Sequence, residues 1–351
     1  MPYRLEPTGR QRSARLNRTD QRCHGGIIDT FQPQHKPHPD IAPDIDPDID
    51  PDRFQTSRAM VNGLSIAYVR AGHGNSCPII LLHGWPESKR IWWKVIQPLA
   101  DAGFDVVAPD LRGFGESDPG PFGDTVAAAI DVAALAAALG FSTFALAAGD
   151  FGGPVAQEVA LRHPASVARL VLFNSPLPLD SQSRSRWKAA GLTTRAATDA
   201  ADYFIRQGTD ADSLAGELAT ESQRLRYIAT FYTSRFWAHP GSFNAAAVAF
   251  HAEPFRNGAV LRSSFRPYEA AFNTTARSEP ALLGPNSVTE TLILFGPSDH
   301  VLYADFDQMA ALVFDHHVGP FLLRHCGHFV PWEAPHAFVS ATRAFCRDLL
   351  D

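Results

Sequence analysis

The chain has 351 residues, 45% of them apolar, so it can bury one large core or two ordinary ones. Its formal net charge of −6, with no basic stripe, argues against a nucleic-acid-binding protein. No apolar run is long enough for a transmembrane helix, no apolar segment follows the N-terminal arginines as in a secretory signal, and the four scattered cysteines lack metal-site spacing. We therefore expect a cytoplasmic protein, monomer or homodimer, without a membrane or nucleic-acid partner.

Residues 1–53 differ in composition from the rest of the chain. An arginine-rich stretch is followed by HKPHPDIAPDIDPDIDPD, in which proline and aspartate recur. Dense proline disfavours helix and sheet, and the neighbouring carboxylates repel one another. We therefore predict a disordered N-terminal tail over residues 1–53. Its composition is better explained by a dispensable extension than by an interaction segment.

From residue 54 onwards the sequence has the pattern of a globular protein. The stretch MVNGLSIAYVRAG alternates in polarity around Asn-Gly, which predicts a β-hairpin. Short apolar runs typical of buried strands follow at PIILLHG, FDVVAPD, FSTFALAAG, ARLVLFN and TLILFG. Helical patterns lie between them at 90–101, 123–139 and 153–163, and a last helix is expected at 334–350. This alternation predicts an α/β fold with a mostly parallel sheet and helices on both faces.

The alternation of strands and helices is interrupted between residues 176 and 286. This segment has helical patterns and many aromatic residues but no buried-strand run. The strand pattern resumes at TLILFG. We therefore predict an α/β core made of residues 54–175 and 287–351, with a helical cap inserted at 176–286.

Polar segments follow the predicted strands at their carboxyl ends, where parallel sheets bind ligands. In AGDFGG, small residues stand two positions away on each side of Asp150, as in a strand-to-helix turn that projects a nucleophile. Alone, this motif could be an ordinary turn. Asp299 in GPSDHV and His328 in CGHFVPWEAP follow later, so the chain order is nucleophile, acid, histidine. The joint pattern predicts Asp150 as nucleophile, His328 as base and Asp299 as the partner of the histidine.

These motifs resemble those of α/β-hydrolases of the epoxide hydrolase and dehalogenase group. HGWP resembles the oxyanion motif of that group, DLRGFGESD its Asp-x-Arg-Gly-x-Gly-x-Ser loop, and GHFVPWEAP its histidine segment. The resemblance runs from about Phe54 to the end and implies an α/β-hydrolase fold, an aspartate nucleophile and no cofactor or metal. By analogy, the backbone N–H groups of Trp85 and Phe151 would form the oxyanion hole.

The group's leaving groups are epoxide oxygens or halides, and they need different partners. Within the group that this chain resembles, haloalkane dehalogenases usually carry Asn at the variable position of HGxP and Trp directly after the nucleophile. This chain has Trp85 and Phe151 at these two positions. Fluoroacetate dehalogenases place Arg after the nucleophile, which Phe151 also does not match. Epoxide hydrolases protonate the leaving oxygen with cap tyrosines. Tyr203 in DYFIRQG resembles the first of these and Tyr268 in SSFRPYEAAF the second, although Glu follows Tyr268 where Arg is usual.

We therefore expect a cofactor-independent epoxide hydrolase that converts a small apolar epoxide to a vicinal diol. The substrate would form an ester with Asp150, which water activated by His328 would hydrolyse. One alternative is a haloalkane or haloacetate dehalogenase that uses the same triad. Another, from a different class, is a non-catalytic binding protein on a hydrolase scaffold, which would be expected to have lost part of the triad. A serine esterase is disfavoured because the predicted turn has no serine.

Overall fold

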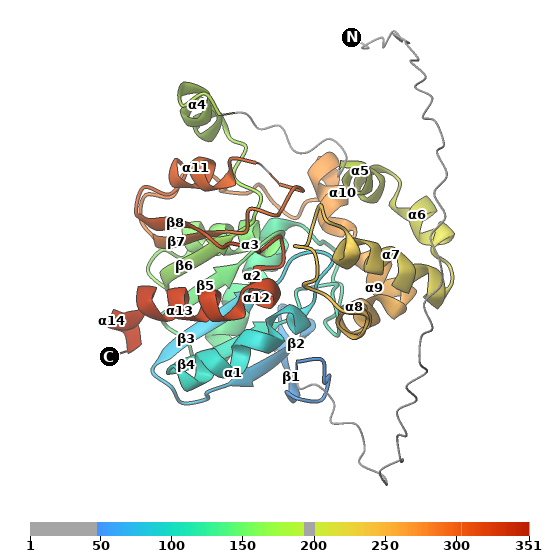
Figure 1. Cartoon of the computed structure of the whole chain (residues 1–351), viewed down its shortest axis with the longest axis horizontal. Coiled ribbons are helices and arrows are strands. Elements are labelled where there is room, and N and C mark those ends of the chain that lie inside the picture. Colours follow the sequence, from blue (N-terminus) through green and yellow to red (C-terminus); the bar gives the residue numbers. More distant parts are fainter. Residues whose placement is uncertain (1–47, 193–200, 303, 351) are drawn as a thin grey trace, which may run out of the picture. The chain divides into compact units, whose positions relative to one another are not determined.

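The computed structural model describes residues 48–192, 201–302 and 304–350 (Figure 1). Residues 1–47 of the predicted tail therefore lie outside the described residues. Residues 48–53 lie within them, and the backbone carbonyl of Asp50 accepts a hydrogen bond from the indole Nε1 of Trp93 at 2.8 Å. The predicted boundary at residue 53 stays a prediction, but the residues just before it already contact the folded chain.

A mostly parallel sheet of eight strands forms the centre of the fold, in the order β1-β2-β4-β3-β5-β6-β7-β8. The strands pair antiparallel from β1 to β2 and from β2 to β4, and parallel elsewhere. Their bounds are β1 Thr56–Val61, β2 Leu64–Ala71, β3 Cys77–Leu82, β4 Phe104–Pro109, β5 Phe144–Ala148, β6 Val167–Phe173, β7 Glu290–Phe295 and β8 His317–Leu322. The predicted α/β fold with a mostly parallel sheet is confirmed.

The first two strands form the predicted hairpin. Asn62 and Gly63 at its turn have φ angles of 51° and 76°, the left-handed conformation that a tight hairpin turn requires. The edge strand β8 was harder to predict from sequence, because most of its residues are exposed and its sequence, HVGPFL, has no continuous apolar run.

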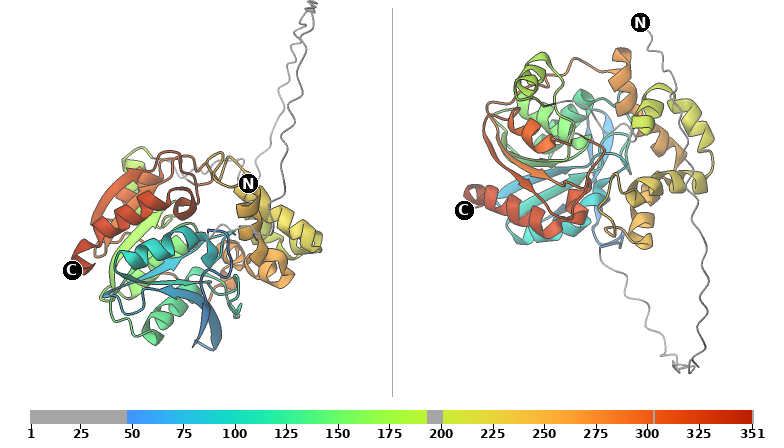
Figure 2. Two further views of the ribbon diagram at one scale, coloured as in Figure 1. Left: turned by 60° about the horizontal axis from the view of Figure 1, so that its bottom comes forward. Right: turned by 45° about the horizontal axis from the view of Figure 1, so that its top comes forward.

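Helices cover both faces of the sheet (Figure 2). Helix α1 (Trp93–Asp101), preceded by the 3₁₀ turn η1 (Lys89–Trp92), packs with α13 (Pro335–Phe345), and α2 (Thr125–Ala138) packs with α3 (Gly152–Arg162). Three shorter helices complete the core. Helix α11 (Phe306–Ala311) follows β7, α12 (Val330–Glu333) follows the candidate histidine, and α14 (Arg347–Leu350) follows α13. The single helix predicted over 334–350 is thus two helices, separated at Cys346.

The segment predicted as a cap contains two kinds of helix. Helix α4 (Ser181–Ala189) contacts the core, because Trp187 Nε1 donates to the Met309 carbonyl at 3.0 Å and Arg186 pairs with Asp315 at 2.8 Å. The later helices form a separate group beside the sheet (Figure 1). They are α5 (Ala201–Thr209), α6 (Ala211–Glu217), α7 (Glu221–Thr233), α8 (Ala245–Ala252), α9 (Gly258–Ser263) and α10 (Arg266–Phe272). We call α5–α10 the cap helices.

Candidate active site

Asp150 lies in a tight turn between strand β5 and helix α3. Its φ angle is 40°, a strained value for a residue with a Cβ atom. The turn also needs small neighbours: a Cβ at Gly84 would lie 2.3 Å from Asp150 Cβ, and one at Gly152 would lie 2.3 Å from the Leu82 carbonyl oxygen. The glycines in HGWP and GDFGG therefore allow two backbone segments to meet around one carboxylate.

The two oxygens of the Asp150 carboxylate face different groups. Oδ1 accepts a hydrogen bond from the backbone N–H of Trp85 at 2.7 Å. Oδ2 lies 3.3 Å from Nε2 of His328, close enough for an ion pair although the two atoms are not aligned for a good hydrogen bond. Phe151, whose N–H was the second predicted oxyanion donor, immediately precedes the first residue of helix α3. Asp150 is 7% exposed, so these contacts form in a largely desolvated environment.

His328 lies between two carboxylates. Its Nδ1–H donates to Asp299 Oδ2 at 2.8 Å, and Asp299 Oδ1 accepts from the Val301 N–H at 2.8 Å. Burial alone would lower the pKa of His328, but the charges of Asp299 and Asp150 outweigh it and raise that pKa well above 6.5. The structure thus brings together the three residues predicted as nucleophile, base and acid, although they are far apart in the sequence.

Asn174 contacts this group of residues in a way that sequence reasoning missed. Its Nδ2 donates to Asp299 Oδ2 at 2.9 Å and to the Gly296 carbonyl at 3.1 Å, and its Oδ1 accepts from the Gly296 N–H at 2.8 Å. Its own carbonyl accepts from the Asp150 N–H at 2.9 Å. Asn174 therefore holds both the candidate acid and the candidate nucleophile. Its place at the end of strand β6 was the available signal. An asparagine was not considered for a role, because its amide has no charge with which to stabilise an imidazolium.

The two predicted cap tyrosines lie against the ring of Trp85, the residue whose backbone N–H binds Asp150. Tyr203 on α5 stacks on the Trp85 ring at 5.4 Å between centroids, and Tyr268 on α10 meets the same ring edge-on at 5.7 Å. Their own rings are 5.9 Å apart. Burial raises the pKa of both phenols well above 10, and the charge of Asp150 adds to the effect. Both side chains therefore stay protonated and can donate hydrogen bonds.

The other two cap tyrosines have their hydroxyl groups engaged elsewhere. The Tyr227 hydroxyl accepts from Gln207 Nε2 at 3.0 Å. The Tyr232 hydroxyl donates to the Pro86 carbonyl, so it ties helix α7 to the HGWP loop.

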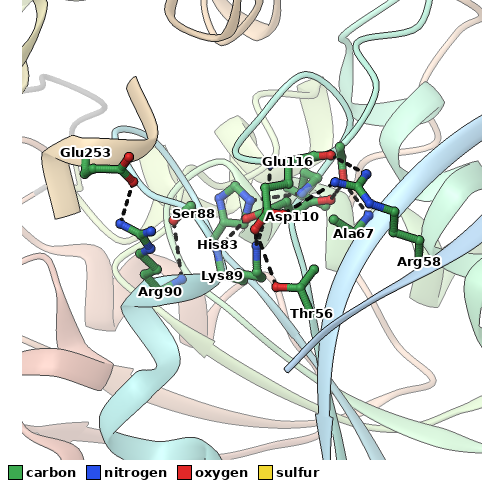
Figure 3. A network of polar contacts seen from close by, with 12 residues as sticks. Thr56, Arg58, Ala67, His83, Ser88, Lys89, Arg90, Asp110, Glu116 and Glu253 are labelled. Atoms are coloured by element: carbon green, nitrogen blue, oxygen red, sulfur yellow. Dashed lines mark hydrogen bonds and ion pairs between the residues drawn. The ribbon is translucent and has the colours of Figure 1, made fainter. Parts of the chain in front are cut away.

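A polar network behind the HGWP loop holds that loop in place (Figure 3). His83 donates from Nδ1 to the Gly84 carbonyl at 2.8 Å and accepts at Nε2 from the Leu111 N–H at 3.0 Å. Because one nitrogen must donate and the other accept, His83 is neutral, and its burial lowers its pKa. In the same network, the buried Asp110 accepts from the backbone N–H and the Nζ of Lys89, at 2.8 and 2.7 Å.

Two further buried carboxylates hold the loops that carry the candidate residues. Glu87 accepts from the Gly84 N–H at 2.6 Å, and burial raises its pKa to about 7. Glu333 accepts from the backbone N–H groups on both sides of His328, those of Gly327 at 3.0 Å and Phe329 at 2.9 Å, and from the His239 N–H at 2.7 Å. The sequence analysis singled out neither carboxylate. Glu333 stands in the quoted segment GHFVPWEAP and Glu87 directly follows HGWP, which was the available signal.

Among the described residues, no cluster of histidine, cysteine and acidic side chains could hold a metal ion. Over the same ranges, the helices are all too short or too polar to cross a membrane.

Comparison with known proteins places these features in a family. Residues 78–335 match the family model described as alpha/beta hydrolase fold. The chain is 29% identical over 290 residues to a soluble epoxide hydrolase of Corynebacterium sp. (strain C12), covering 82% of this chain and 96% of the relative. It is 28% identical over 298 residues to epoxide hydrolase 3 of Mus musculus, covering 82% and 76%. The solved structure of epoxide hydrolase CorEH without ligand superposes with a TM-score of 0.71 at 25% identity, over 84% of this chain and 99% of that one.

Proposed function

Since the chain belongs to the alpha/beta hydrolase fold family and is an epoxide hydrolase-like enzyme within it, we propose that it opens epoxides to vicinal diols through a covalent ester on Asp150. The observation that carries this proposal is the contact of Asp150 with a histidine–aspartate pair and with Trp85, whose ring packs against two phenols of raised pKa. This arrangement supplies a nucleophile, a base and two proton donors around one tryptophan.

In the first step, Asp150 Oδ2 attacks a ring carbon and the bond from that carbon to the epoxide oxygen breaks. Oδ2 is the attacking atom because Oδ1 already accepts from the Trp85 N–H. The epoxide oxygen stays on the substrate and takes a proton from Tyr268 or Tyr203. The product of this step is a neutral ester between Asp150 and the substrate.

In the second step, a water molecule that gives its proton to His328 attacks the carboxyl carbon of the Asp150 ester. Negative charge then develops on Oδ1, where the backbone N–H groups of Trp85 and Phe151 would stabilise it. Collapse of this intermediate breaks the bond between the carboxyl carbon and Oδ2, and the departing oxygen takes the second proton of the attacking water. The diol leaves with Oδ2, and one oxygen of the regenerated Asp150 carboxylate comes from water. Asp299, held by Asn174, stabilises the imidazolium form of His328.

Ester formation itself prepares His328 to act as a base. While Asp150 is ionised, its charge raises the pKa of His328 and favours the protonated imidazole. Once Asp150 is an ester, that charge is gone and the pKa of His328 falls. The proton that His328 then gives up restores the phenol that protonated the epoxide oxygen. The imidazole can then accept the proton of the attacking water.

The donors near Asp150 suit an epoxide oxygen better than a halide. A halide leaves as an anion and needs N–H donors, but the Phe151 side chain has none and the Trp85 indole Nε1 donates to Ser264 Oγ at 3.1 Å. The paired phenols suit an oxygen that must be protonated. Aromatic walls at Trp85, Phe231 and Trp237 favour a small apolar epoxide. A cytoplasmic location and a monomeric or homodimeric state remain part of this proposal.

The test compares two substrates of equal chain length, a terminal epoxide and a terminal bromoalkane. The full chain should release diol from the epoxide, measured by chromatography, and no bromide from the bromoalkane. The Asp150→Ala variant should do neither. Bromide release by the wild-type chain without diol formation would replace the epoxide proposal with dehalogenation.

A further inference from the structure

Trp85 contributes to the proposed site through two separate parts. Its backbone N–H binds Asp150 Oδ1 at 2.7 Å, and its indole ring packs against Tyr203 and Tyr268, whose ring centroids lie 5.4 and 5.7 Å away. The side chain of Trp85 is fully buried. Because both phenols pack directly on this ring, a change in its orientation would move them relative to the nucleophile.

Ser264, which directly follows helix α9, holds the indole of Trp85. The ring Nε1–H donates to Ser264 Oγ at 3.1 Å, and the Oγ–H donates to the Leu261 carbonyl at 2.7 Å. A serine hydroxyl has a single proton, so its bond to Leu261 leaves a lone pair as the acceptor for the indole. Ser264 is fully buried, so bulk water does not compete for either bond.

The aromatic neighbours of Trp85 leave the rotation of its ring less well defined. Phe231 and Trp237 meet the indole at 4.7 and 6.2 Å between centroids, and neither side chain has an oxygen or nitrogen that accepts a hydrogen bond. The χ2 torsion of a tryptophan has two broad minima, which surrounding apolar rings distinguish only weakly. In the turned-over orientation the buried indole N–H would lose its acceptor, which is unfavourable. The hydrogen bond to Ser264 therefore selects one orientation of the ring.

The segment that holds the ring also carries one of the two phenols. Ser264 lies between helices α9 and α10, and Tyr268 follows four positions later on α10. The Tyr268 N–H donates to the Phe265 carbonyl at 3.0 Å, which ties the first turn of α10 to the residue next to Ser264. The acceptor for the indole and one proposed proton donor therefore belong to the same short piece of backbone.

We propose that Ser264 is a positioning residue for the opening of the epoxide: through Trp85 it holds the two phenols where they can protonate the leaving oxygen. This inference rests on the proposed epoxide hydrolase function and deepens it. Hydrolysis of the ester does not need Ser264, because that step uses His328 and the backbone N–H of Trp85. The HGWP loop that carries this N–H has contacts of its own, with Glu87 and with Tyr232.

Three variants test this assignment in rapid-mixing measurements of the two steps. Ser264→Ala should lower the rate of ester formation on a terminal epoxide about tenfold and change the rate of ester hydrolysis by less than about twofold. Ser264→Thr, which keeps the hydroxyl, should recover ester formation to within about threefold of the wild-type rate. Ser263→Ala is the matched control and should keep both rates, because it removes a neighbouring buried hydroxyl that has no hydrogen-bond partner among the described residues. Equal falls in both rates, or wild-type ester formation in Ser264→Ala, would contradict the proposal.

A spectroscopic measurement separates this proposal from the proposed function. NMR spectra of the chain with isotopically labelled indole groups give one N–H signal for each tryptophan, and Trp85→Phe identifies the signal of Trp85. Ser264→Ala should shift this signal and speed its exchange with heavy water, while Ser263→Ala should leave it in place. An unchanged signal in Ser264→Ala would remove Ser264 as the residue that orients the ring, with or without epoxide turnover. A shifted signal in a chain whose wild type does not hydrolyse epoxides would keep that orienting role and remove the epoxide function. Slow ester formation in Ser264→Thr with the wild-type signal would exclude the hydroxyl as the cause.

Discussion

Two carboxylates contact the imidazole of His328 at the candidate site, and in the proposed mechanism their roles differ because only Asp150 reacts. Asp299, 2.8 Å from His328, keeps its charge throughout the proposed cycle. Asp150, 3.3 Å from His328, would lose its charge on becoming the proposed ester. The same histidine would therefore be an imidazolium beside the ionised carboxylate and a base beside the ester.

This separation of roles predicts that His328→Gln stops the reaction halfway. Attack by Asp150 needs no base, so the ester should still form, but water should no longer be activated to hydrolyse it. Mass spectrometry after incubation with an epoxide should show a stable adduct of substrate mass on the peptide that contains Asp150. Asp150→Ala should show no adduct. Normal turnover by His328→Gln would mean that another residue is the base.

The phenols lead to a second prediction at the residue scale. Tyr268→Phe removes one hydroxyl and keeps the ring packed against Trp85, so the fold should survive. The rate of ester formation on epoxides should fall by about 10²-fold, and Tyr203→Phe combined with it should lower the rate much further. Hydrolysis of the preformed ester should change little. Rapid-mixing measurements of ester formation test this, with Tyr227→Phe as the matched control. Wild-type rates in both single variants would exclude the phenols as proton donors.

At the scale of elements, helices α7 and α8 contribute to the attachment of the cap helices to the core. The Tyr232 hydroxyl donates to the Pro86 carbonyl, and Arg90 donates to the Phe250 carbonyl at 2.8 Å. Next to these contacts, the His251 ring meets the Trp332 ring edge-on at 4.3 Å and stacks on Tyr232 at 5.1 Å. A titratable ring therefore stands inside an aromatic contact between the cap and helix α12.

His251 should make this contact sensitive to acid. Burial lowers its pKa well below 6.5, and the positive charges of Arg90 and Lys94 lower it further. Below pH 6.5 the unfolded chain binds a proton at this position more readily than the folded chain does, so stability falls as the pH drops through that value. His251→Phe removes the titration and keeps an aromatic ring. Between pH 7.5 and 5.5 its melting temperature should fall by ~2–4 °C less than that of the wild type. Equal falls in both chains would contradict this.

At the scale of the whole molecule, the N-terminal segment divides into residues that the structure describes and residues that it does not. Trp93, which is 1% exposed, donates its indole N–H to the Asp50 carbonyl and meets the Phe54 ring edge-on at 5.2 Å. We expect removal of the predicted tail to cost little stability. This expectation therefore needs two tests, one in which Asp50 is kept and one in which it is removed as well.

Two truncated chains make this comparison. A chain that begins at residue 48 keeps the Asp50 carbonyl and should melt at the temperature of the full chain. A chain that begins at residue 54 leaves the buried Trp93 N–H without its acceptor, at a cost of about 1–3 kcal/mol. Its melting temperature should be lower by at least ~2–4 °C, while its epoxide turnover should be unchanged because Trp93 is not among the residues proposed to act on the substrate. Equal melting temperatures for the two chains would show that Asp50 contributes nothing measurable.

Apart from the edge strand β8, the strands of the core could be predicted from the sequence, as could the turn around Asp150 and the chain order of Asp150, Asp299 and His328. Each of these is a local pattern, because a buried parallel strand is a short apolar run and a tight turn needs small residues at fixed offsets. The family resemblance added the roles of Trp85 and the cap tyrosines. The order of the strands in the sheet and the division of the last helix at Cys346 needed the structure.

Only the tertiary structure decided which other side chains belong to the site. Asn174 meets Asp299 across 125 positions, and the contact of Glu333 with His239 spans 94. No local pattern predicts such contacts, because they depend on how neighbouring strands and the inserted helices come together after the elements have formed.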